Sequence, residues 1–327
     1  MKVLVTGATG FVGRHLCPML IEAGHEVAAA IRADTAPDLP AAVKCINVGD
    51  LTPGTLWRDA LESIDGVIHL AARTHVMKET EANPLMAYRR MNVEVTRRLA
   101  NECAVLGIKR LVFMSSIKVN GERTTTTPFT AATPPAPEDA YGITKRDAES
   151  ELARATEGTS TEISVLRAPL VYGPGVKGNF LRLMHAVHDG KMLPLGMIAN
   201  RRSLVYVGNL CSAMCACLEQ PQAAGKTYLV RDSEDLSTTA LVRRIAQALM
   251  TDTKLLPVPA ALLRLAGQIF GQGPTIARLT GSLQIDDLAL REDLSWQPPF
   301  SVDQGLEHTA TWFKQQIVEE QGRGDAA

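Results

Sequence analysis

Aromatic residues are scarce in this sequence, and neither sign of charge is in excess. Phe, Trp and Tyr make up 5% of the chain, and 34 Lys and Arg residues stand against 35 Asp and Glu residues. A net charge of −1 offers no attraction to a polyanion, so the composition predicts no nucleic-acid partner. The sequence also lacks an apolar run of membrane-spanning length, which predicts no insertion into a bilayer.

Cysteines are present, but their spacing is not that of a metal site. Cys211, Cys215 and Cys217 share one apolar helical stretch, where we expect buried thiols, with a metal cluster as the alternative. The first expected strand begins at the second residue, which predicts that no signal peptide precedes it. Thiols without disulfide partners and the predicted absence of a signal peptide favour a reduced protein in the cytoplasm, without a metal.

Short apolar runs alternate with helical patterns through the first half of the chain. This alternation predicts an α/β fold, a Rossmann-type doubly wound parallel sheet with a smaller mixed C-terminal substrate-binding lobe. Residues 1–173 are expected to form the dinucleotide-binding domain, with roughly 201–232 returning to it, and 174–327 to form mainly the lobe. The expected strands are 2–7, 26–31, 43–48, 66–72, 110–116 and 163–169, and the expected helices are 11–23, 85–106 and 139–155.

Beyond residue 173 the pattern weakens. We expect short strands near 203–207 and 227–231 and a helix over 301–320. The Thr- and Pro-rich stretch 123–140 is predicted to be a loop that borders the site, because it cannot easily form a helix or a central strand.

A glycine-rich turn, GATGFVG, lies at the first expected junction of strand and helix. Gly7, Gly10 and Gly13 allow a tight turn and a close approach of backbone N–H groups to a pyrophosphate at the helix N-terminus. Their spacing is G-x-x-G-x-x-G rather than G-x-G-x-x-G. The turn predicts a dinucleotide site, to which we also assign Thr9, Phe11 and Val12.

The end of the second strand bears on the choice between NAD and NADP. An acidic residue there binds the ribose 2′-hydroxyl of NAD, whereas an Arg accommodates the 2′-phosphate of NADP. The strand ends in Ile31 and Arg32, with no carboxylate before Asp34, so NADP(H) is favoured and NAD(H) stays open. Asp50 is expected at the adenine amino group, or else to cap a turn. Further cofactor contacts are assigned to residues at the expected strand ends: Leu51, Leu70, Ala71, Ala72 and Pro169.

The tetrad YGITK places Tyr141 and Lys145 on one face of a helix. An ammonium beside a phenol stabilises the phenolate and lowers its pKa, which would let Tyr141 act as an acid or base near neutral pH. Ser115 and Ser116 close the fifth expected strand, where a hydroxyl can hold the substrate oxygen. Together with the glycine-rich turn, these residues predict hydride transfer at a carbinol carbon.

Segments along nearly the whole chain resemble the extended short-chain dehydrogenases/reductases of the nucleotide-sugar epimerase/dehydratase group. They are VTGATGFVG, HLAA, MNVEVT, MSSIKVNG, YGITK, LRAPLVYGPG, RRSLVYVGNL and LSWQPPFSVDQGL. The resemblance implies catalytic roles for Ser116, Tyr141 and Lys145, and a supporting role for Asn92 beside the cofactor. It implies that a nucleoside diphosphate is held by substrate-binding residues among Lys118, Lys177, Asn179, Phe180 and Arg202, with Ser116 on the sugar.

Two departures from the group's pattern narrow the reaction. Sugar 4,6-dehydratases of the group carry Asp-Glu after the catalytic Ser or Thr, whereas this chain has Ile117 and Lys118, which argues against dehydration. Epimerases that retain NAD usually have an acidic residue after the second strand, whereas this chain has Arg32.

Stretches such as HVMKETEANPLMAYRRMNVE and GPGVKGNFLRLM resemble a bacterial subgroup that reduces the C4 keto group of UDP-4-keto-6-deoxy-N-acetylhexosamines for surface polysaccharide. An NADPH-dependent 4-ketoreductase is therefore the leading hypothesis. A UDP-sugar 4-epimerase with retained NAD is the alternative, and a dinucleotide-binding regulator without catalysis is disfavoured by the Tyr/Lys pair.

The resemblance also implies a homodimer built from helices 85–106 and 139–155. Met91, Val95, Leu99 and Cys103 have the spacing for such an interface, although they could equally face the protein's own sheet.

Overall fold

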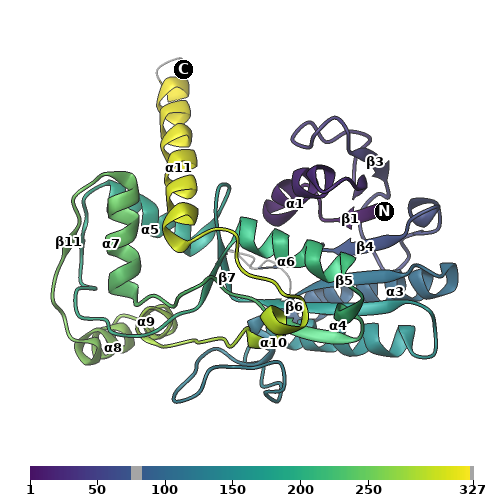
Figure 1. Cartoon of the computed structure of the whole chain (residues 1–327). Coiled ribbons are helices and arrows are strands. Elements are labelled where there is room, and N and C mark those ends of the chain that lie inside the picture. Colours follow the sequence, from purple (N-terminus) through teal and green to yellow (C-terminus); the bar gives the residue numbers. More distant parts are fainter. Residues whose placement is uncertain (75–82, 325–327) are drawn as a thin grey trace.

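Seven parallel strands form the central sheet of the computed structural model, which describes residues 1–74 and 83–324 (Figure 1). The strand order is β10-β6-β5-β4-β1-β2-β3. Because every pairing is parallel, all seven carboxyl ends lie along one edge. The strands are β1 (Lys2–Thr6), β2 (Glu26–Ile31), β3 (Lys44–Asn47), β4 (Gly66–His69), β5 (Arg110–Ser116), β6 (Glu162–Ala168) and β10 (Lys226–Leu229).

Helices cover both faces of the sheet, as near-continuous apolar strands require. α1 (Phe11–Glu22) and α6 (Val207–Glu219) pack together on one face, and α3 (Val95–Leu106) and α4 (Ala140–Thr156) pack together on the other (Figure 1). The alternation of side chains along β1 shows the division: Val3 and Val5 join the core under α1, whereas Leu4 joins the core over α3. The predicted Rossmann-type doubly wound fold is confirmed.

Most expected strands and helices form with bounds within one or two residues of those predicted. The strand expected over 66–72 is shorter, because β4 ends at His69. Its pairing with β1 stops at Thr6, where the chain of β1 turns away at Gly7, whose φ is +71°. Leu70, Ala71 and Ala72 therefore follow the strand instead of ending it.

The helix expected over 85–106 is built in three consecutive pieces. α2 (Pro84–Arg89) leads through a π-helical turn (Arg90–Glu94) into α3. Val95, Leu99 and Cys103 are fully buried against the sheet, and Met91 packs on the same cluster. These four side chains face the protein's own sheet, and the homodimer stays a prediction. The resembling stretch that begins at residue 75 has its first eight residues outside the described part of the chain.

The rest of the C-terminal half forms a mixed lobe beside the sheet (Figure 1). Its two-stranded sheets pair β7 with β9 and β8 with β11, and α11 packs on α7. Its elements are β7 (Leu170–Tyr172), α5 (Gly178–His188), β8 (Met192–Leu193), β9 (Leu204–Tyr206), α7 (Thr238–Leu249), β11 (Lys254–Leu255), α8 (Ala260–Ile269), α9 (Gly273–Thr280), α10 (Leu288–Asp293) and α11 (Val302–Gly324).

The Thr- and Pro-rich stretch 123–140 is a loop, as predicted, and hydrogen bonds hold it to two other parts of the chain. Thr124 N–H donates to the carbonyl of Ser282, and Phe129 N–H donates to that of Gln284. The side-chain amide of Asn120 donates to the carbonyls of Thr130 and Thr133. The loop is thus held between the end of β5 and the C-terminal lobe.

The six thiols are free, and all but that of Cys45 are buried. Burial raises the pKa of Cys215 to about 12 and that of Cys217 to about 11, so both stay protonated at neutral pH. The expectation of buried thiols at Cys211, Cys215 and Cys217 is confirmed. Within residues 1–74 and 83–324, no helix has the length and apolarity to cross a membrane.

Candidate active site

The glycine-rich turn lies where β1 meets α1, and its backbone passes very close to β4. A Cβ on Gly7 would lie 2.8 Å from the backbone nitrogen of Ala71, and one on Gly13 would lie 2.4 Å from the carbonyl oxygen of Ala8. Gly10 caps α1 without any side-chain hydrogen bond, which leaves N–H groups of the first turn for a ligand. Backbone N–H groups at a helix N-terminus bind phosphate oxygens well, so the turn fits a dinucleotide pyrophosphate.

The other predicted cofactor residues lie along the same carboxyl edge. Arg32 follows β2, Asp50 follows β3, Ala71 and Ala72 follow β4, and Pro169 follows β6. The guanidinium of Arg32 lies 3.7 Å from the carboxylate of Asp50, and both side chains are largely exposed. Three of the assigned residues are buried or partly buried. Val12 lies in the core under α1, Leu70 packs against that core, and Leu51 packs against the core over α3. They can offer a cofactor their backbone or a flat apolar wall.

A cleft of about 440 Å³ opens beside the glycine-rich turn. Thr9, Gly10 and Phe11 form one wall, and residues from the loop after β7 and from α11 form the other. Lys177, which the resemblance assigned to the substrate, lines this cleft and therefore lies next to the turn. A lysine at this position can contribute positive charge to bound phosphate.

Ser116, Tyr141 and Lys145 are brought together by the packing of α4 on β5. The ammonium of Lys145 lies 4.1 Å from the ring centroid of Phe113, on β5. The first turn of α4 presses on the turn after Ser116: a Cβ on Gly142 would lie 2.7 Å from the carbonyl oxygen of Lys118. The trio thus gathers at the carboxyl edge of β5, next to the end of β4.

The two serines at the end of β5 have different partners. Ser115 donates its hydroxyl hydrogen to Glu149, whereas Ser116 accepts a hydrogen bond of 3.3 Å from the backbone N–H of Lys118. Because Ser115 is committed to Glu149, Ser116 is the serine left to hold a substrate oxygen. This geometry agrees with the choice that the resemblance makes.

Burial sets the protonation of Tyr141 and Lys145 in the ligand-free protein. It raises the pKa of Tyr141, with smaller contributions from Asp139 and Tyr88, so the phenol is neutral. Burial also lowers the pKa of Lys145 to about 7, although the nearby carboxylate of Glu149 acts in the opposite direction and raises this pKa. The expected lowering of the Tyr141 pKa by Lys145 is therefore absent in this state, because desolvation outweighs it.

A buried polar network behind Lys145 was not anticipated from the sequence. Glu149 accepts two hydrogen bonds from Arg167, of 3.0 and 2.6 Å, and Arg167 also donates to Asn120. Arg167 and Asn120 are almost fully buried. Glu149 follows Lys145 by four residues on the same helix face, and this spacing was the one available sign of its role.

Two further side chains of the site were also missed. His69, fully buried at the end of β4, bonds to Thr6 (2.6 Å) and Thr96 (2.9 Å), and burial together with Lys145 lowers its pKa to about 3. Thr144 donates to the carbonyl of Tyr141 and accepts from the amide of Asn92. Asn92 also bonds to the backbone of Arg73, so it ties the segment after β4 to α4.

Several predicted substrate residues are held by neighbouring groups in the ligand-free protein. Lys118 is held between Glu122 (2.7 Å) and Asp139 (2.5 Å). Phe180 is buried and stacks on Tyr172, and Asn179 accepts a hydrogen bond from Arg182. Arg202 donates to the carbonyls of Arg278 (2.9 Å) and Gly281 (3.2 Å) in the C-terminal lobe.

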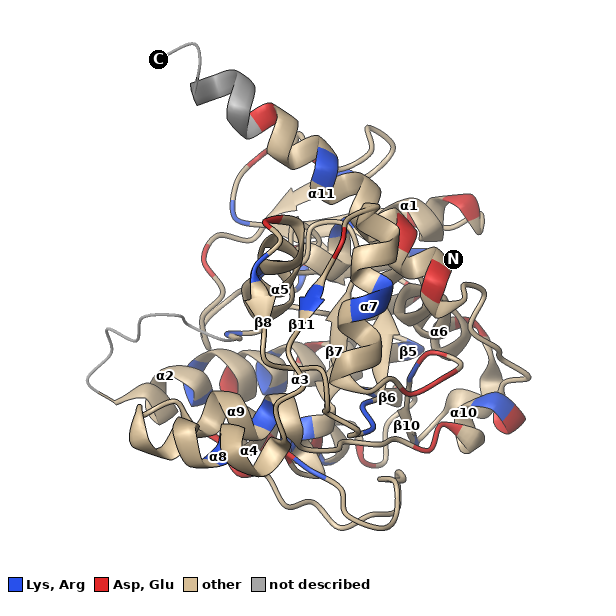
Figure 2. Cartoon of the chain, turned by 90° about the vertical axis from the view of Figure 1, so that its left-hand side faces the viewer, with Lys and Arg blue, Asp and Glu red and all other residues tan. Residues whose placement is uncertain are grey.

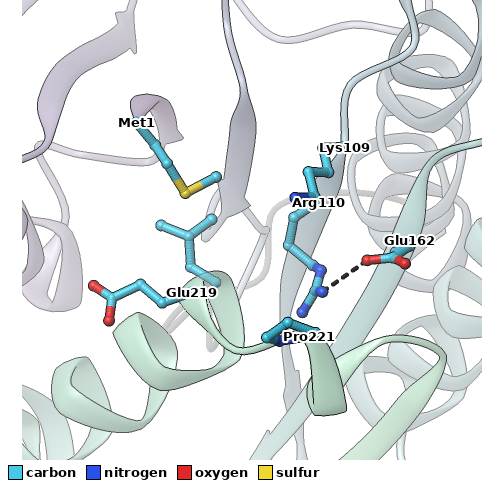
Figure 3. A pocket seen from close by; sticks show the side chains of 7 residues that line it. Met1, Lys109, Arg110, Glu162, Glu219 and Pro221 are labelled. Carbon is cyan, nitrogen blue, oxygen red and sulfur yellow. Dashed lines mark hydrogen bonds and ion pairs between the residues drawn. The ribbon is translucent and has the colours of Figure 1, made fainter.

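A small hollow of about 100 Å³ lies at the opposite edge, where β5 and β6 begin. Figure 3 shows Arg110 pointing toward Glu162 within it, and the two side chains form an ion pair of 2.7 Å. Arg110 also donates to the carbonyls of Cys217 and Gln220, so it joins α6 to the sheet. Across residues 1–74 and 83–324, no group of three His, Cys, Asp or Glu side chains is arranged to hold a metal.

The sheet, the glycine-rich turn and the Ser/Tyr/Lys trio are those of an extended short-chain dehydrogenase/reductase. Residues 3–230 match the NAD dependent epimerase/dehydratase family. The chain therefore belongs to the NAD dependent epimerase/dehydratase family, and the family that its motifs resemble is confirmed.

Individual relatives differ in the reaction for which they are named. A UDP-glucose 4-epimerase of Vibrio cholerae is 41% identical over 317 residues, which cover 96% of each chain. A 2-alkyl-3-oxoalkanoate reductase of Stenotrophomonas maltophilia is 30% identical and covers 76% of each chain. The solved structure of a UDP-glucuronic acid 4-epimerase from Bacillus cereus in complex with NAD has a TM-score of 0.78, at 22% identity, over 97% of this chain and 99% of that one.

Proposed function

We propose that this protein transfers hydride at C4 of a UDP-linked sugar, and that it acts as a 4-ketoreductase on a UDP-4-keto-6-deoxy-N-acetylhexosamine. The arrangement of Ser116, Tyr141 and Lys145 at the carboxyl edge of β5, beside the glycine-rich turn, carries the proposal. The 41% identical UDP-glucose 4-epimerase supports a UDP-sugar as the substrate class. The product is proposed to enter surface polysaccharide synthesis in the cytoplasm.

The residues of the site suit proton donation. A bound nicotinamide dinucleotide supplies the hydride. Ser116 donates a hydrogen bond to the C4 carbonyl oxygen, and Tyr141, whose pKa burial raises, gives its proton to that oxygen. The ammonium of Lys145 stabilises the phenolate that remains and also hydrogen-bonds the ribose next to the nicotinamide. In the ligand-free protein the phenol is neutral, which is the protonation state from which this donation starts.

The position after β2 supports NADPH as the reductant. Arg32 is exposed at the carboxyl edge, and the nearby Asp50 is 3.7 Å away and equally exposed, so the guanidinium can turn toward a ribose 2′-phosphate. Asp50 is then free for the adenine amino group. Arg202 and Lys177 are assigned to the phosphates, while Lys118, Asn179 and Phe180 border the sugar nucleotide.

A second candidate, a UDP-sugar 4-epimerase with retained NAD, is favoured by the name of the 41% identical relative. It would use the same three residues: the proton would leave the hydroxyl oxygen at C4 and the hydride would leave C4 itself, and the hydride would then return to the opposite face of C4 while the oxygen regains a proton. In that reaction Tyr141 first accepts the proton of the sugar hydroxyl, so it has to start as the phenolate that Lys145 stabilises.

One assay separates the candidates. The purified protein is mixed with a UDP-4-keto-6-deoxy sugar and NADPH, and the absorbance of the reduced nicotinamide is followed. Oxidation of NADPH in proportion to the sugar supports the reductase. Interconversion of UDP-glucose and UDP-galactose, or of their N-acetyl forms, without net cofactor use supports the epimerase and contradicts the reductase. A protein inert in both assays would act as a dinucleotide-binding regulator.

A further inference from the structure

One helix of the C-terminal lobe is apolar on the face that it turns to solvent. On α8, Leu262 and Leu265 are more than half exposed, and Ile269 and Phe270 at its end are 71% and 76% exposed. With Leu256, which precedes the helix, they form what we call the α8 patch. The inward face is apolar too: Leu263 is buried, and a Cβ on Gly267 would lie 2.8 Å from Ile276 of α9. Apart from the exposed Arg264 and Gln268, α8 is thus apolar on its outward as well as its inward face, and exposed apolar surface of this kind marks an interaction site.

The segment that carries the patch, between Asp252 and Asp286, has charges of one sign. From Thr253 to Ile285 the sequence carries Lys254, Arg264 and Arg278 and no Asp or Glu, although acidic and basic residues balance over the whole chain. All three basic residues are exposed. Arg264 donates to the hydroxyl of Thr280 (3.1 Å), which keeps its guanidinium at the junction of α8 and α9. Figure 2 shows α8 and α9 side by side near the edge of the molecule.

This charge distribution argues against a second copy of the chain as the occupant. A two-fold interface places the same surface of each copy against the other, so the three cations would meet their own counterparts. The segment contains no carboxylate that could pair with them. Apolar side chains flanked only by cations instead match the boundary between acyl chains and anionic headgroups of a lipid bilayer.

We propose that the α8 patch docks this protein on the surface of a membrane that contains anionic phospholipids. Leu262, Leu265, Ile269 and Phe270 enter the headgroup boundary, while Lys254, Arg264 and Arg278 contact the phosphates. The helix lies on the bilayer and does not cross it, in agreement with the membrane-span finding.

Docking would bring the substrate side of the lobe close to the bilayer. The end of α9 and the residue after it contact Arg202 through the carbonyls of Arg278 and Gly281, and the carbonyls of Ser282 and Gln284 accept hydrogen bonds from the loop 123–140. The α8 patch therefore belongs to the same part of the lobe that borders the proposed sugar site. The proposal itself does not depend on which sugar reaction the site performs.

The test is sedimentation of the whole protein with vesicles. We expect the protein to sediment with vesicles of phosphatidylcholine and phosphatidylglycerol, and about tenfold less with phosphatidylcholine alone or at high salt. The double variant Leu265→Glu/Ile269→Glu should lose about tenfold in vesicle binding, because it places two carboxylates at the apolar boundary. The matched control Leu56→Glu/Met250→Glu changes two other exposed apolar residues and should bind like the parent.

A second variant guards against a fold defect in the first. Lys254→Gln/Arg264→Gln leaves the apolar face intact and should reduce binding to anionic vesicles while leaving the weak binding to neutral ones unchanged. Circular dichroism checks that each variant is folded. Equal binding by the patch and control variants, or no binding to anionic vesicles at low salt, would overturn the proposal. So would a concentration-dependent dimer, seen by analytical ultracentrifugation, that Leu265→Glu/Ile269→Glu abolishes.

Discussion

Two regions of the sheet's carboxyl edge are built very differently: the region at β5, which we call the buried end, and the region at β2 and β3, which we call the exposed end. At β5 the proposed catalytic residues are embedded in a buried network in which Lys145, Glu149, Arg167 and Asn120 hold one another through hydrogen bonds and charge. At β2 and β3, Arg32 and Asp50 are exposed and joined by a single long ion pair. Buried charges are costly to separate, whereas exposed pairs contribute little. If the proposed roles hold, the catalytic residues are fixed by packing, whereas the choice of dinucleotide rests on exposed residues.

The sharpest test of the buried end is Tyr141→Phe. We expect turnover to fall by about 10²–10⁴-fold, because the variant keeps the ring and loses the transferable proton. Steady-state kinetics measure the loss, and fluorescence titration should show that the dinucleotide still binds. Tyr228→Phe, which removes a hydroxyl bonded to Asp293 away from the site, serves as the control. Full activity in Tyr141→Phe would contradict the assigned proton donor.

Glu149→Gln tests whether the network supports Lys145. Removing one partner of a buried ion pair should lower the free energy of unfolding by about 3–5 kcal/mol, measured by chemical denaturation. Glu151→Gln is the matched control on the same helix, since Glu151 forms a surface pair with Arg154 and should cost under about 1 kcal/mol. Equal losses of unfolding free energy in the two variants would show that the network adds no stability to the buried end.

Glu149→Gln also tests how the activity depends on pH. Burial lowers the pKa of Lys145 to about 7, so its ammonium, and with it the activity, should be lost as the pH rises through that region. The carboxylate of Glu149 raises this pKa, hence Glu149→Gln should move the alkaline fall in kcat to lower pH. A pH–rate profile measures the shift. A fall at the same pH in parent and variant would mean that Lys145 does not control it.

Gly13→Ala tests the glycine-rich turn that lies between the two ends. Its added methyl would meet the Ala8 carbonyl, so we expect a loss of about 1–3 kcal/mol in the free energy of unfolding together with weaker dinucleotide binding. Thermal unfolding and a binding titration measure the two effects. Gly54→Ala, where the nearest atom is 3.7 Å away, should leave both unchanged. A tolerated Gly13→Ala would mean that the turn has room for a side chain.

Arg32→Asp addresses the exposed end, where we expect the smallest effect. The variant should bind NADPH about tenfold more weakly, because the carboxylate repels the 2′-phosphate, while NADH binding is kept or improved. Isothermal titration of both dinucleotides measures the ratio. Arg243→Asp, which reverses an exposed charge on α7, is the control. An unchanged ratio in Arg32→Asp would remove the argument for NADPH.

Local sequence patterns predicted the strands, the glycine-rich turn and the Tyr/Lys pair with little error. The reason is that each depends on neighbours in sequence: apolar runs for buried strands, glycines for the tight turn, and a spacing of one helical turn for Tyr141 and Lys145. Hydride chemistry and the family followed from the order of these short segments along the chain.

Contacts between distant segments decided the rest. Only the packing of α4 on β5 commits Ser115 to Glu149 and leaves Ser116 for substrate, and only burial reverses the expected shift of the Tyr141 pKa. The pairing of Glu149 with Arg167 joins residues of α4 and β6, and the exposure of the α8 patch depends on which elements pack against it. Desolvation and long-range packing are properties of the folded surface and core, and no run of neighbouring residues encodes them.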